Sequence, residues 1–512
     1  MKKHKFKILK HSMLISSCAI VIVAGGISAP AFAAPTYTIT DVLVAEDQYQ
    51  GERRVTPKPI FKPHETDASR LPRFWISSNE RGEEEGGDPV ASRAGITILR
   101  NGNNAVLSQL DIEGKCLPVV NPDGSAYGCA PPGAEDHPRH PHGIDIDADN
   151  GLAYQVVEHS GLQWNADRTG FEVAVSTDEE SALLLTYDIS DPENPEILEG
   201  YVLGHAAEES AVNEMNSKVY VGNHEPSPTD VPCFVSVIDR NADTAMGESP
   251  YIFIDLADEF QCVQGIEADE TLNQVFGTTH LGEVMYAFNS EDDTIAYSVD
   301  IRGPFDAQVT GLTGGVPEGF VLHMHDLTAD GDNHRAYQTI HTLAPGVLGG
   351  DEETEEESGE ISGRWVAAVD VDPDSDSFQG VVIIDLSNGQ TADDVPSHED
   401  NEDEVAFEDR FVHAHFIAVD PTRDALLVSG EHTGNLGVVD IRSDELEQVV
   451  AISRPIPGCE RVPEIDPETG EVLPLGPAEP HVHGVNIQQM AHTVYVSDEG
   501  EDCFYESVTI LR

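Results

Sequence analysis

The chain has 512 residues and is strongly acidic, with 93 acidic residues against 28 basic ones and a formal net charge of −65. Such a surface repels nucleic acid and anionic membranes, so the composition excludes both as partners. A carboxylate-rich, lysine-poor composition is typical of halophilic proteins, because salt screens the repulsion between like charges.

Residues 1–33 are predicted to be a secretory signal peptide. Five lysines precede the apolar run MLISSCAIVIVAGGISA, and Ala31-Phe32-Ala33 fits the small-x-small cleavage rule. A membrane anchor is disfavoured because the run is short and a cleavage motif follows it. We therefore expect a secreted or periplasmic protein.

Cysteine usage agrees with an oxidising compartment. Cys18 lies in the signal, and the other six cysteines fall into three pairs along the chain. We expect the sequential pairing, because each disulfide would then staple a loop to its own neighbourhood. The predicted bridges are Cys116–Cys129, Cys233–Cys262 and Cys459–Cys503.

One pattern recurs along the chain, with a period of roughly 60 to 90 residues. Each copy begins with an alternating run, passes through a turn with Asp, Asn or Gly, and continues in a β-branched or aromatic run. Several copies reach a third run that ends in Asp, which completes the meander of a propeller blade. The copies begin at His140, Gly204, Gln264, His323, His413 and His481.

These repeats predict an all-β fold, a seven-bladed β-propeller, with six or eight blades as alternatives. Residues 73–112 carry a weaker pattern that supplies the seventh blade. We expect the propeller to span residues 73–512. Residues 34–72, which are Pro-rich and weakly patterned, should form an N-terminal arm. The C-terminal run Val508–Arg512 is expected to complete the first blade and so close the ring.

Most of the 19 histidines outside the signal occupy two places in the repeat. Four copies begin with a pair spaced i, i+2, which places both imidazoles on one face of a strand. The first strand of each propeller blade lines the central channel, so equivalent positions should meet around the axis. Neutral imidazoles suit copper, zinc, iron or nickel, whereas calcium prefers oxygen. The predicted metal ligands are His140, His142, His205, His323, His325, His413, His415, His481 and His483.

A second set of side chains follows one strand later and could supply further ligands or orienting hydrogen bonds. Its histidines are His159, His224, His280, His341 and His432. The candidate catalytic carboxylates are Glu158, Glu431 and Asp326; Glu208, Glu209 and Glu267 are weaker candidates. The copy that begins at Gln264 lacks a leading histidine, so we expect the ring to be open to substrate there. A structural role is the alternative, since polar side chains also tie neighbouring propeller strands together.

The motifs HPHG at 140–143, GH at 204–205, HxH at 323–325 and 413–415, and HVHG at 481–484 resemble those of the copper-cluster propellers. That family includes thiocyanate dehydrogenase and the propeller domain of nitrous oxide reductase. The resemblance covers residues 73–512 and implies a multinuclear copper centre. No Cys-, His- and Met-rich electron-transfer domain follows, which disfavours nitrous oxide reduction. The thiocyanate dehydrogenase site includes a lysine, for which Lys115 is the nearest candidate.

Two functions follow from these motifs. The first is a copper-dependent oxidoreductase that oxidises a small inorganic or sulfur-containing substrate and passes electrons to a soluble acceptor such as a cytochrome c. The alternative is a non-catalytic periplasmic propeller that binds or carries zinc or copper. A lactonase-like hydrolase fits less well, because such sites are built mainly from carboxylates around one cation.

Overall fold

The residues that the computed structural model describes all belong to one unit, residues 35–512. The described residues are 36–44, 62–67, 74–80, 94–101, 103, 105–112, 115–130, 140–165, 168–174, 180–223, 233–246, 248–256, 262–312, 320–343, 360–386, 414–453, 482–488, 493–498 and 507–512. The predicted signal peptide lies outside them. No helix within these ranges has the length and apolar character that a membrane span requires.

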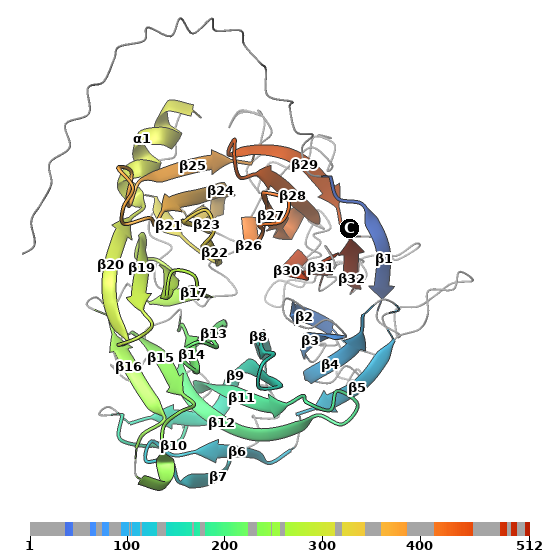
Figure 1. The fold of residues 1–512 in the computed structure, drawn as a ribbon, viewed down its shortest axis with the longest axis vertical. Helices are drawn as coiled ribbons and strands as arrows, with labels where there is room; N and C mark the ends of the chain where they lie inside the picture. The colour runs from blue at the N-terminus through green and yellow to red at the C-terminus, as the bar shows by residue number, and fades with distance from the viewer. Residues whose placement is uncertain are drawn as a thin grey trace, which may run out of the picture. The chain divides into compact units, whose positions relative to one another are not determined.

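The described strands form seven sheets, which follow one another around a central channel (Figure 1). Blade 1 holds β2 (Lys62–Asp67), β3 (Phe74–Glu80), β4 (Gly95–Arg100) and β5 (Val106–Asp111). Blade 2 holds β8 (Pro141–Asp147), β9 (Leu152–Trp164), β11 (Ser181–Asp188) and β12 (Glu196–His205), with β10 (Phe171–Val173) beside β9 and the hairpin of β6 (Leu117–Val120) and β7 (Ala126–Ala130) beside β12.

The next three blades follow in chain order. Blade 3 holds β13 (Ser210–Asn213), β14 (Lys218–Val221), β15 (Phe234–Asp239) and β16 (Tyr251–Asp255). Blade 4 holds β17 (Val263–Asp269), β18 (Gln274–Thr279), β19 (Val284–Asn289) and β20 (Thr294–Asp300). In blade 5, β21 (Val321–His323) and β22 (Leu327–Asp330) both pair with β23 (Arg335–Leu343), and β24 (Glu360–Asp370) and β25 (Val381–Asp385) follow.

The last two blades complete the circle. Blade 6 holds β26 (Ala414–Asp420), β27 (Ala425–Gly430), β28 (Asn435–Asp440) and β29 (Glu445–Ala451). Blade 7 holds β30 (Val482–Gln488), β31 (Thr493–Asp498), β32 (Ser507–Leu511) and β1 (Ile39–Val44). The innermost strands contact one another in the closed order β2, β8, β13, β17, β22, β26 and β30. The predicted all-β propeller is thereby confirmed.

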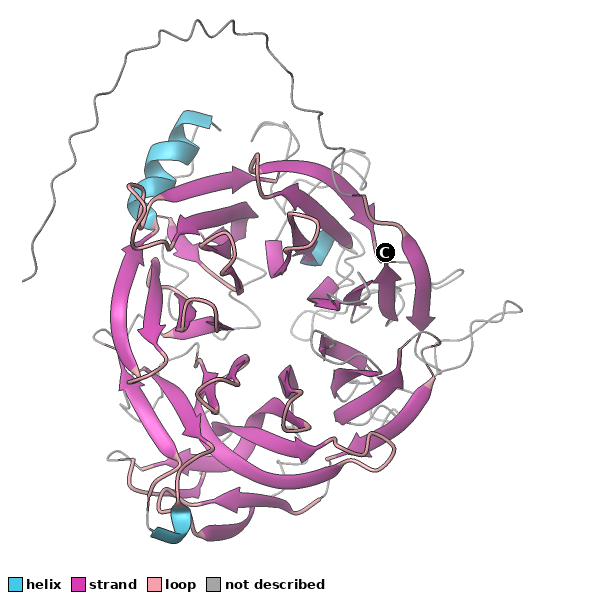
Figure 2. Ribbon diagram, in the orientation of Figure 1, coloured by secondary structure: helices cyan, strands magenta, loops and turns pink. Residues whose placement is uncertain are grey.

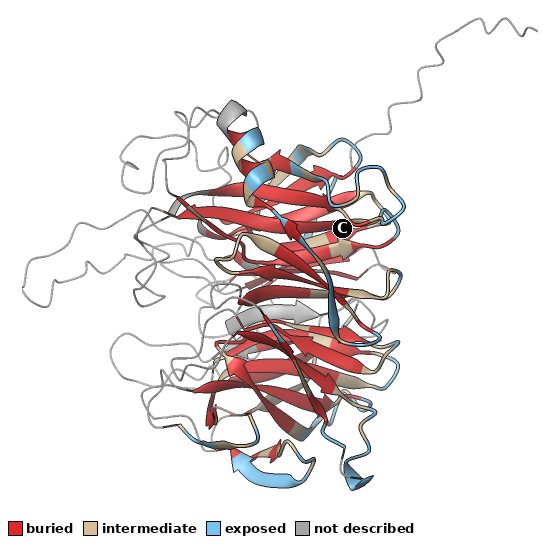
Figure 3. Cartoon of the chain, turned by 90° about the vertical axis from the view of Figure 1, so that its left-hand side faces the viewer, coloured by how far each residue is buried: buried red, intermediate tan, exposed pale blue. Residues whose placement is uncertain are grey.

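Helical structure is minor among the described residues (Figure 2). It consists of α1 (Arg302–Leu312), beside blade 5, and the short 3-10 turns η2 (Thr244–Met246) and η5 (Glu431–Thr433). Middle strands are buried on both faces, as β11 and β27 show, because each blade packs between two others (Figure 3). This explains why those strands read as continuous apolar runs in the sequence.

The turns after the inner strands β8, β22 and β26 are built from side-chain chemistry that the sequence displays. The carboxylate of Asp147 accepts the backbone N–H of Asn150 at 3.0 Å, and that of Asp330 accepts the N–H of Asn333 at 3.1 Å. The turn then ends on a residue with positive φ, such as Gly151 at 65° or Asp424 at 52°. A turn that finishes in this left-handed conformation returns the chain as a hairpin, as the repeat predicts.

The ring closes differently from the prediction. β32 lies in blade 7 beside β31, and its partner on the other side is β1, with Ile39 opposite Leu511 and Val44 opposite Ser507. The expectation that Val508–Arg512 completes the first blade is therefore wrong. The predicted arm at 34–72 is also wrong, because it contains β1 and β2. The sequence of β2, KPHETD, lacks the apolar alternation that would have revealed a strand.

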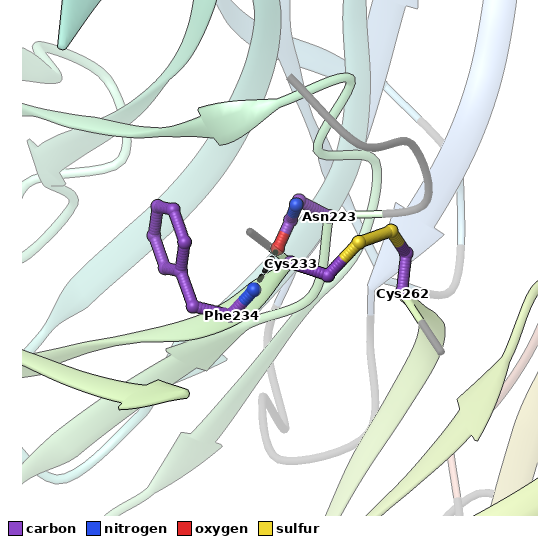
Figure 4. The surroundings of a disulfide bond; sticks show 4 residues. All are labelled: Asn223, Cys233, Phe234 and Cys262. Carbon is purple, nitrogen blue, oxygen red and sulfur yellow. Dashed lines mark hydrogen bonds between the residues drawn. A yellow bond between two sulfur atoms is a disulfide. The ribbon is translucent and has the colours of Figure 1, made fainter. Parts of the chain in front are cut away.

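Two of the three predicted disulfides are confirmed. Cys116–Cys129 closes the β6–β7 hairpin, and Cys233–Cys262 joins the start of β15 to the start of β17 (Figure 4). Beside the second bridge, the side chain of Asn223 accepts the backbone N–H of Phe234 at 3.4 Å. The predicted Cys459–Cys503 bridge lies outside the described residues.

A buried ion pair ties blade 2 to blade 3 and gives a stability prediction. Arg240 donates to the carboxylate of Asp147, which is fully buried, and to the hydroxyl of Tyr154 at 3.0 Å. Burial raises the pKa of Asp147, but hydrogen bonds from Asn150 and Arg240 outweigh it and hold that pKa below its ordinary value. Replacing Arg240 with methionine should lower the free energy of unfolding at pH 7 by about 3 kcal/mol, because it strands a buried carboxylate.

Urea unfolding measured against pH tests this prediction. A depressed carboxyl pKa stabilises the fold above the unfolded pKa of about 4, and that stability is lost as the pH falls. The difference between the wild type and Arg240→Met should therefore shrink below pH about 4. Arg442→Met is the control, because the side chain of Arg442 is 41% exposed where it pairs with Asp440, against 13% for Arg240. Equal losses in the two variants would contradict the account.

Candidate metal centre

Backbone register shows which side chains occupy equivalent places in the repeat. The N–H of Glu158 donates to the carbonyl of His140 at 2.8 Å, and the N–H of His280 donates to that of Cys262 at 2.8 Å. His323 lies opposite His341 in the same register. Glu158, His280 and His341 are thus equivalent, whereas His159 is offset by one residue from the set in which the sequence analysis placed it.

The same register identifies the positions that replace histidines. Cys262 takes the place of His140 and His323, and it forms the disulfide to Cys233. Two residues later, Gln264 takes the place that His142 and His325 hold in their blades. Blade 4 therefore has a disulfide and an amide where blades 2 and 5 have a pair of imidazoles.

In blade 2, Glu158 brings two of the predicted ligands together. Its Oε2 lies 3.0 Å from Nδ1 of His140, 3.4 Å from Nε2 of His142 and 3.8 Å from Nε2 of His159. One potential ligand atom from each of His140, His142 and Glu158 lies within 4.8 Å of the other two. Burial raises the pKa of Glu158, but hydrogen bonds from the two imidazoles outweigh it and hold the pKa well below its ordinary value. The carboxylate is therefore ionised at neutral pH.

Across blades 4, 5 and 6, five imidazoles form a continuous cluster. Nε2 of His325 and Nε2 of His415 are 2.7 Å apart, and both side chains are buried. The ring of His323 lies 4.4 Å from that of His280, 5.6 Å from that of His325 and 5.2 Å from that of His341, between ring centroids. The trailing histidines His280 and His341 thus contact the leading His323. The sequence repeat alone only suggested this contact.

Several of these rings are held in a defined tautomer. A backbone carbonyl only accepts, so the nitrogen that faces it must carry the hydrogen. His341 Nε2 lies 2.7 Å from the carbonyl of Ala414, which leaves the lone pair on Nδ1. His140 Nδ1 faces the Glu158 carboxylate at 3.0 Å, which leaves the lone pair on Nε2. Metal-bound histidines typically donate their other N–H to a carbonyl or a carboxylate, so these residues fit a metal centre.

His205 does not belong to the inner ring. It is the last residue of β12, the fourth strand of blade 2, and its Nδ1 lies 2.8 Å from the carbonyl of Glu180. The inner strand β13 begins only at Ser210. The expectation that His205 leads an inner strand is therefore wrong: the sequence copies were aligned on the letters GH, and the chain turns before it enters blade 3.

Other predicted ligands lie outside the described residues or have side chains that the structure does not describe. His413, His481 and the trailing His224 fall outside them. His483 lies in β30 and His432 in η5, and only their place in the fold is given. Neither the predicted convergence of these residues nor their part in a metal centre is tested.

The two remaining candidate carboxylates have distinct surroundings. Glu431 is buried, with its Oε2 3.6 Å from Nδ1 of His415, so it accompanies the imidazole cluster. Asp326 accepts the N–H of Ile417 at 2.7 Å and that of Leu327 at 2.6 Å, which ties blade 5 to blade 6. Burial raises the pKa of Asp326 to about 7, although these bonds and one with Glu209 oppose the rise.

A cavity of about 530 Å³ occupies the channel and is lined by six carboxylates. They are Asp145, Glu209, Glu214, Glu267, Glu270 and Asp326. None of the described histidines lines this cavity. Along each inner strand, the leading histidines come before the residues that line the cavity. The sequence pointed to Glu209, Glu267 and Asp326 but not to Asp145, which lies in β8, or to Glu214 and Glu270, which lie in the turns after β13 and β17.

Gln264 corrects the expected opening in the ring. Its side chain is buried, and its amide reaches Nε2 of His323 at 3.3 Å and the carboxylate of Glu208 at 3.0 Å. The side chain of Gln264 therefore fills the space in blade 4 where the sequence analysis expected an opening for substrate. Lys115, the nearest candidate for the lysine that the resemblance implies, is exposed beside the β6–β7 hairpin, and Lys62 begins the inner strand β2.

Comparison with known proteins gives distant structural likenesses only. No family model and no curated protein matches the chain. Kuenenia stuttgartiensis hydrazine synthase is similar with a TM-score of 0.47 and 12% identity, over 90% of this chain and 99% of that one. The Cps50 (Swd1) β-propeller domain of Myceliophteria thermophila has a TM-score of 0.46 and 8% identity, over 93% and 99% of the two chains. At such values the likenesses say nothing about function.

Proposed function

We propose that the protein is an exported copper-dependent oxidoreductase that acts on a small inorganic or sulfur-containing substrate, as the motif resemblance implies. The observation that carries the proposal is the pair of buried nitrogens, His325 Nε2 and His415 Nε2, 2.7 Å apart. Two imidazole nitrogens at that distance share one proton, because one ring must donate and the other accept. The two rings come from neighbouring blades, so the fold brings them together.

The pair needs little adjustment to hold a metal ion. Nitrogens bound about 2.0–2.1 Å from one ion lie roughly 3 Å apart at angles near 90–110°. A movement of a few tenths of an ångström would thus let an ion replace the shared proton. A copper ion bound there would store electrons and polarise a small ligand, and imidazole ligands suit both roles.

The chain's own residues would orient the metal ligands and direct the approach of the substrate. Glu158 stays ionised at neutral pH and lies 3.0 Å from Nδ1 of His140 and 3.4 Å from Nε2 of His142, so it would orient the two rings toward an ion. The carboxylate-lined cavity repels anions, so an anionic substrate would approach from the histidine side. Lys62, which begins the inner strand β2, is our candidate for the lysine of the thiocyanate dehydrogenase site, in place of Lys115.

A metal carrier is the second candidate, and one observation favours it. The side chain of His140 is 41% exposed, against 11% for His142 and 17% for Glu158, so this group is open to solvent on one side. An exposed two-histidine, one-carboxylate group can exchange an ion more readily than the buried His325–His415 pair. Copper or zinc would then be cargo, and a soluble electron acceptor would have no part.

Protein purified from the periplasm separates the two proposals. We expect bound copper, an electron paramagnetic resonance signal with nitrogen coupling, and reduction of added cytochrome c that requires both the protein and a reduced sulfur compound such as thiocyanate. Zinc or copper that passes to a chelator within minutes, without cytochrome reduction, would favour the carrier. Protein that binds neither metal after dialysis against each would end both proposals.

A further inference from the structure

We propose that Gln264 is a positioning residue that fixes the tautomer of His323, so that Nδ1 of that ring is the nitrogen available to a metal ion. This inference rests on the proposed metal centre for its purpose. Its physical content, the location of one proton on one ring, stands without any metal.

The orientation of the amide follows from Glu208. The side-chain nitrogen of Gln264 lies 3.0 Å from Oε2 of Glu208, and a carboxylate accepts hydrogen bonds. Nε2 of the amide must therefore face Glu208, and its Oε1 faces the other way, toward His323. The opposite orientation would place two acceptor oxygens against each other, so Glu208 selects one of the two amide orientations.

The amide orientation then selects the tautomer of the imidazole. Oε1 of Gln264 lies 3.3 Å from Nε2 of His323, and an amide oxygen only accepts. Nε2 must carry the hydrogen, and a neutral imidazole has only one N–H. The lone pair of His323 is therefore on Nδ1. His341, whose ring lies 5.2 Å from that of His323, has its lone pair on Nδ1 for the same kind of reason.

The backbone of blade 4 is built to bring Gln264 to this place. A Cβ on Gly265 would lie 2.6 Å from the carbonyl of His325, so only glycine lets β17 approach blade 5 this closely. On the other side of Gln264, Val263 forms a bridge with Asn223, and Cys262 is held by its disulfide. Gln264 itself is 3% exposed, so water does not compete for its amide.

The place of Gln264 between Glu208 and His323 explains why this position holds an amide and not an imidazole. In blades 2, 5 and 6 the same place holds His142, His325 and His415. A glutamine there supplies no metal ligand of the preferred kind, but it has both a donor and an acceptor and can therefore transmit the preference of Glu208 to His323. Side chains that orient metal-binding histidines typically change metal affinity about 10- to 100-fold when they are replaced.

The test uses Gln264→Met, which keeps the length of the side chain and removes its hydrogen bonds. In metal-free protein with 15N-labelled histidine, two-bond nitrogen–hydrogen correlations report the tautomer, and His323 is identified by its loss in His323→Asn. We expect an Nε2–H ring in the wild type and a mixture of tautomers in Gln264→Met. Copper affinity, measured by competition with a chelator, should fall about 10- to 100-fold, with the number of bound ions unchanged.

Gln338→Met is the matched control. Gln338 is equally buried and also joins blade 5 to blade 4, through a hydrogen bond from Thr278 at 2.7 Å. This variant should leave the tautomer of His323 and the copper affinity unchanged. An Nδ1–H ring in the wild type, an unchanged tautomer in Gln264→Met, or an equal loss of affinity in the control would each overturn the inference. Protein that binds no copper would defeat the proposed function, whereas the tautomer result would still decide the inference.

Discussion

Replacing His325 and His415 together with glutamine is expected to remove at least one copper ion per chain and to abolish turnover. The two Nε2 atoms lie 2.7 Å apart in a buried site, and no single neighbouring ring can replace both. Glutamine keeps polar atoms and most of the side-chain volume, so the blades should remain folded. Copper content, the rate of cytochrome c reduction and urea unfolding would be measured on the same preparation.

His334→Asn is the control for this experiment. His334 lies in the turn after β22 with a φ of 54°, a conformation that asparagine tolerates well. The substitution removes an imidazole from the same blade and should leave copper content and rate at wild-type values. Full copper content and rate in the double variant would show that the pair only joins the blades.

Deleting residues 36–44 should cause the largest loss of stability. The deletion removes β1, the strand that pairs with β32 from Ile39 opposite Leu511 to Val44 opposite Ser507. It also removes the buried Leu43 and the buried Tyr37, whose hydroxyl donates to Asp420 at 2.8 Å. Burial of two such side chains contributes about 1.5–3 kcal/mol each, so we expect a loss of about 3–6 kcal/mol.

Thermal unfolding of the truncated chain, with and without a synthetic peptide of residues 36–44, measures this effect. The peptide should restore part of the lost stability, because β32 would again have a partner on its open edge. A peptide in which Tyr37 and Leu43 are both replaced with serine is the control and should restore less. If the truncated chain unfolded at the wild-type temperature, β1 would not close the ring.

The fold could be predicted largely because each blade repeats the same local chemistry. The Asp147 and Asp330 turns and the apolar runs of β11 and β27 are visible in the sequence, and both described disulfides follow from cysteines near each other in the chain. Ring closure was not predictable in the same way. The pairing of β1 with β32 joins the two ends of the propeller, and no local pattern records it.

The candidate site was predictable in its residue types but not in its register. The paired histidines identified His140, His142, His323 and His325. The structure places Glu158 beside the first pair, and His280 and His415 beside the second. The equivalence of Glu158 with His341 depends on hydrogen bonds between strands, which repeat spacing does not specify. The role of Gln264 was missed because a glutamine at a histidine position looks like the loss of a site.

Anomalous diffraction at the copper edge, from crystals of protein loaded with copper, tests the central claim most directly. We predict a peak between His325 and His415, with both Nε2 atoms about 2.0–2.1 Å from the ion. Electron density in which the two rings remain hydrogen-bonded to each other at 2.7 Å, with no anomalous peak beside them, would contradict the claim.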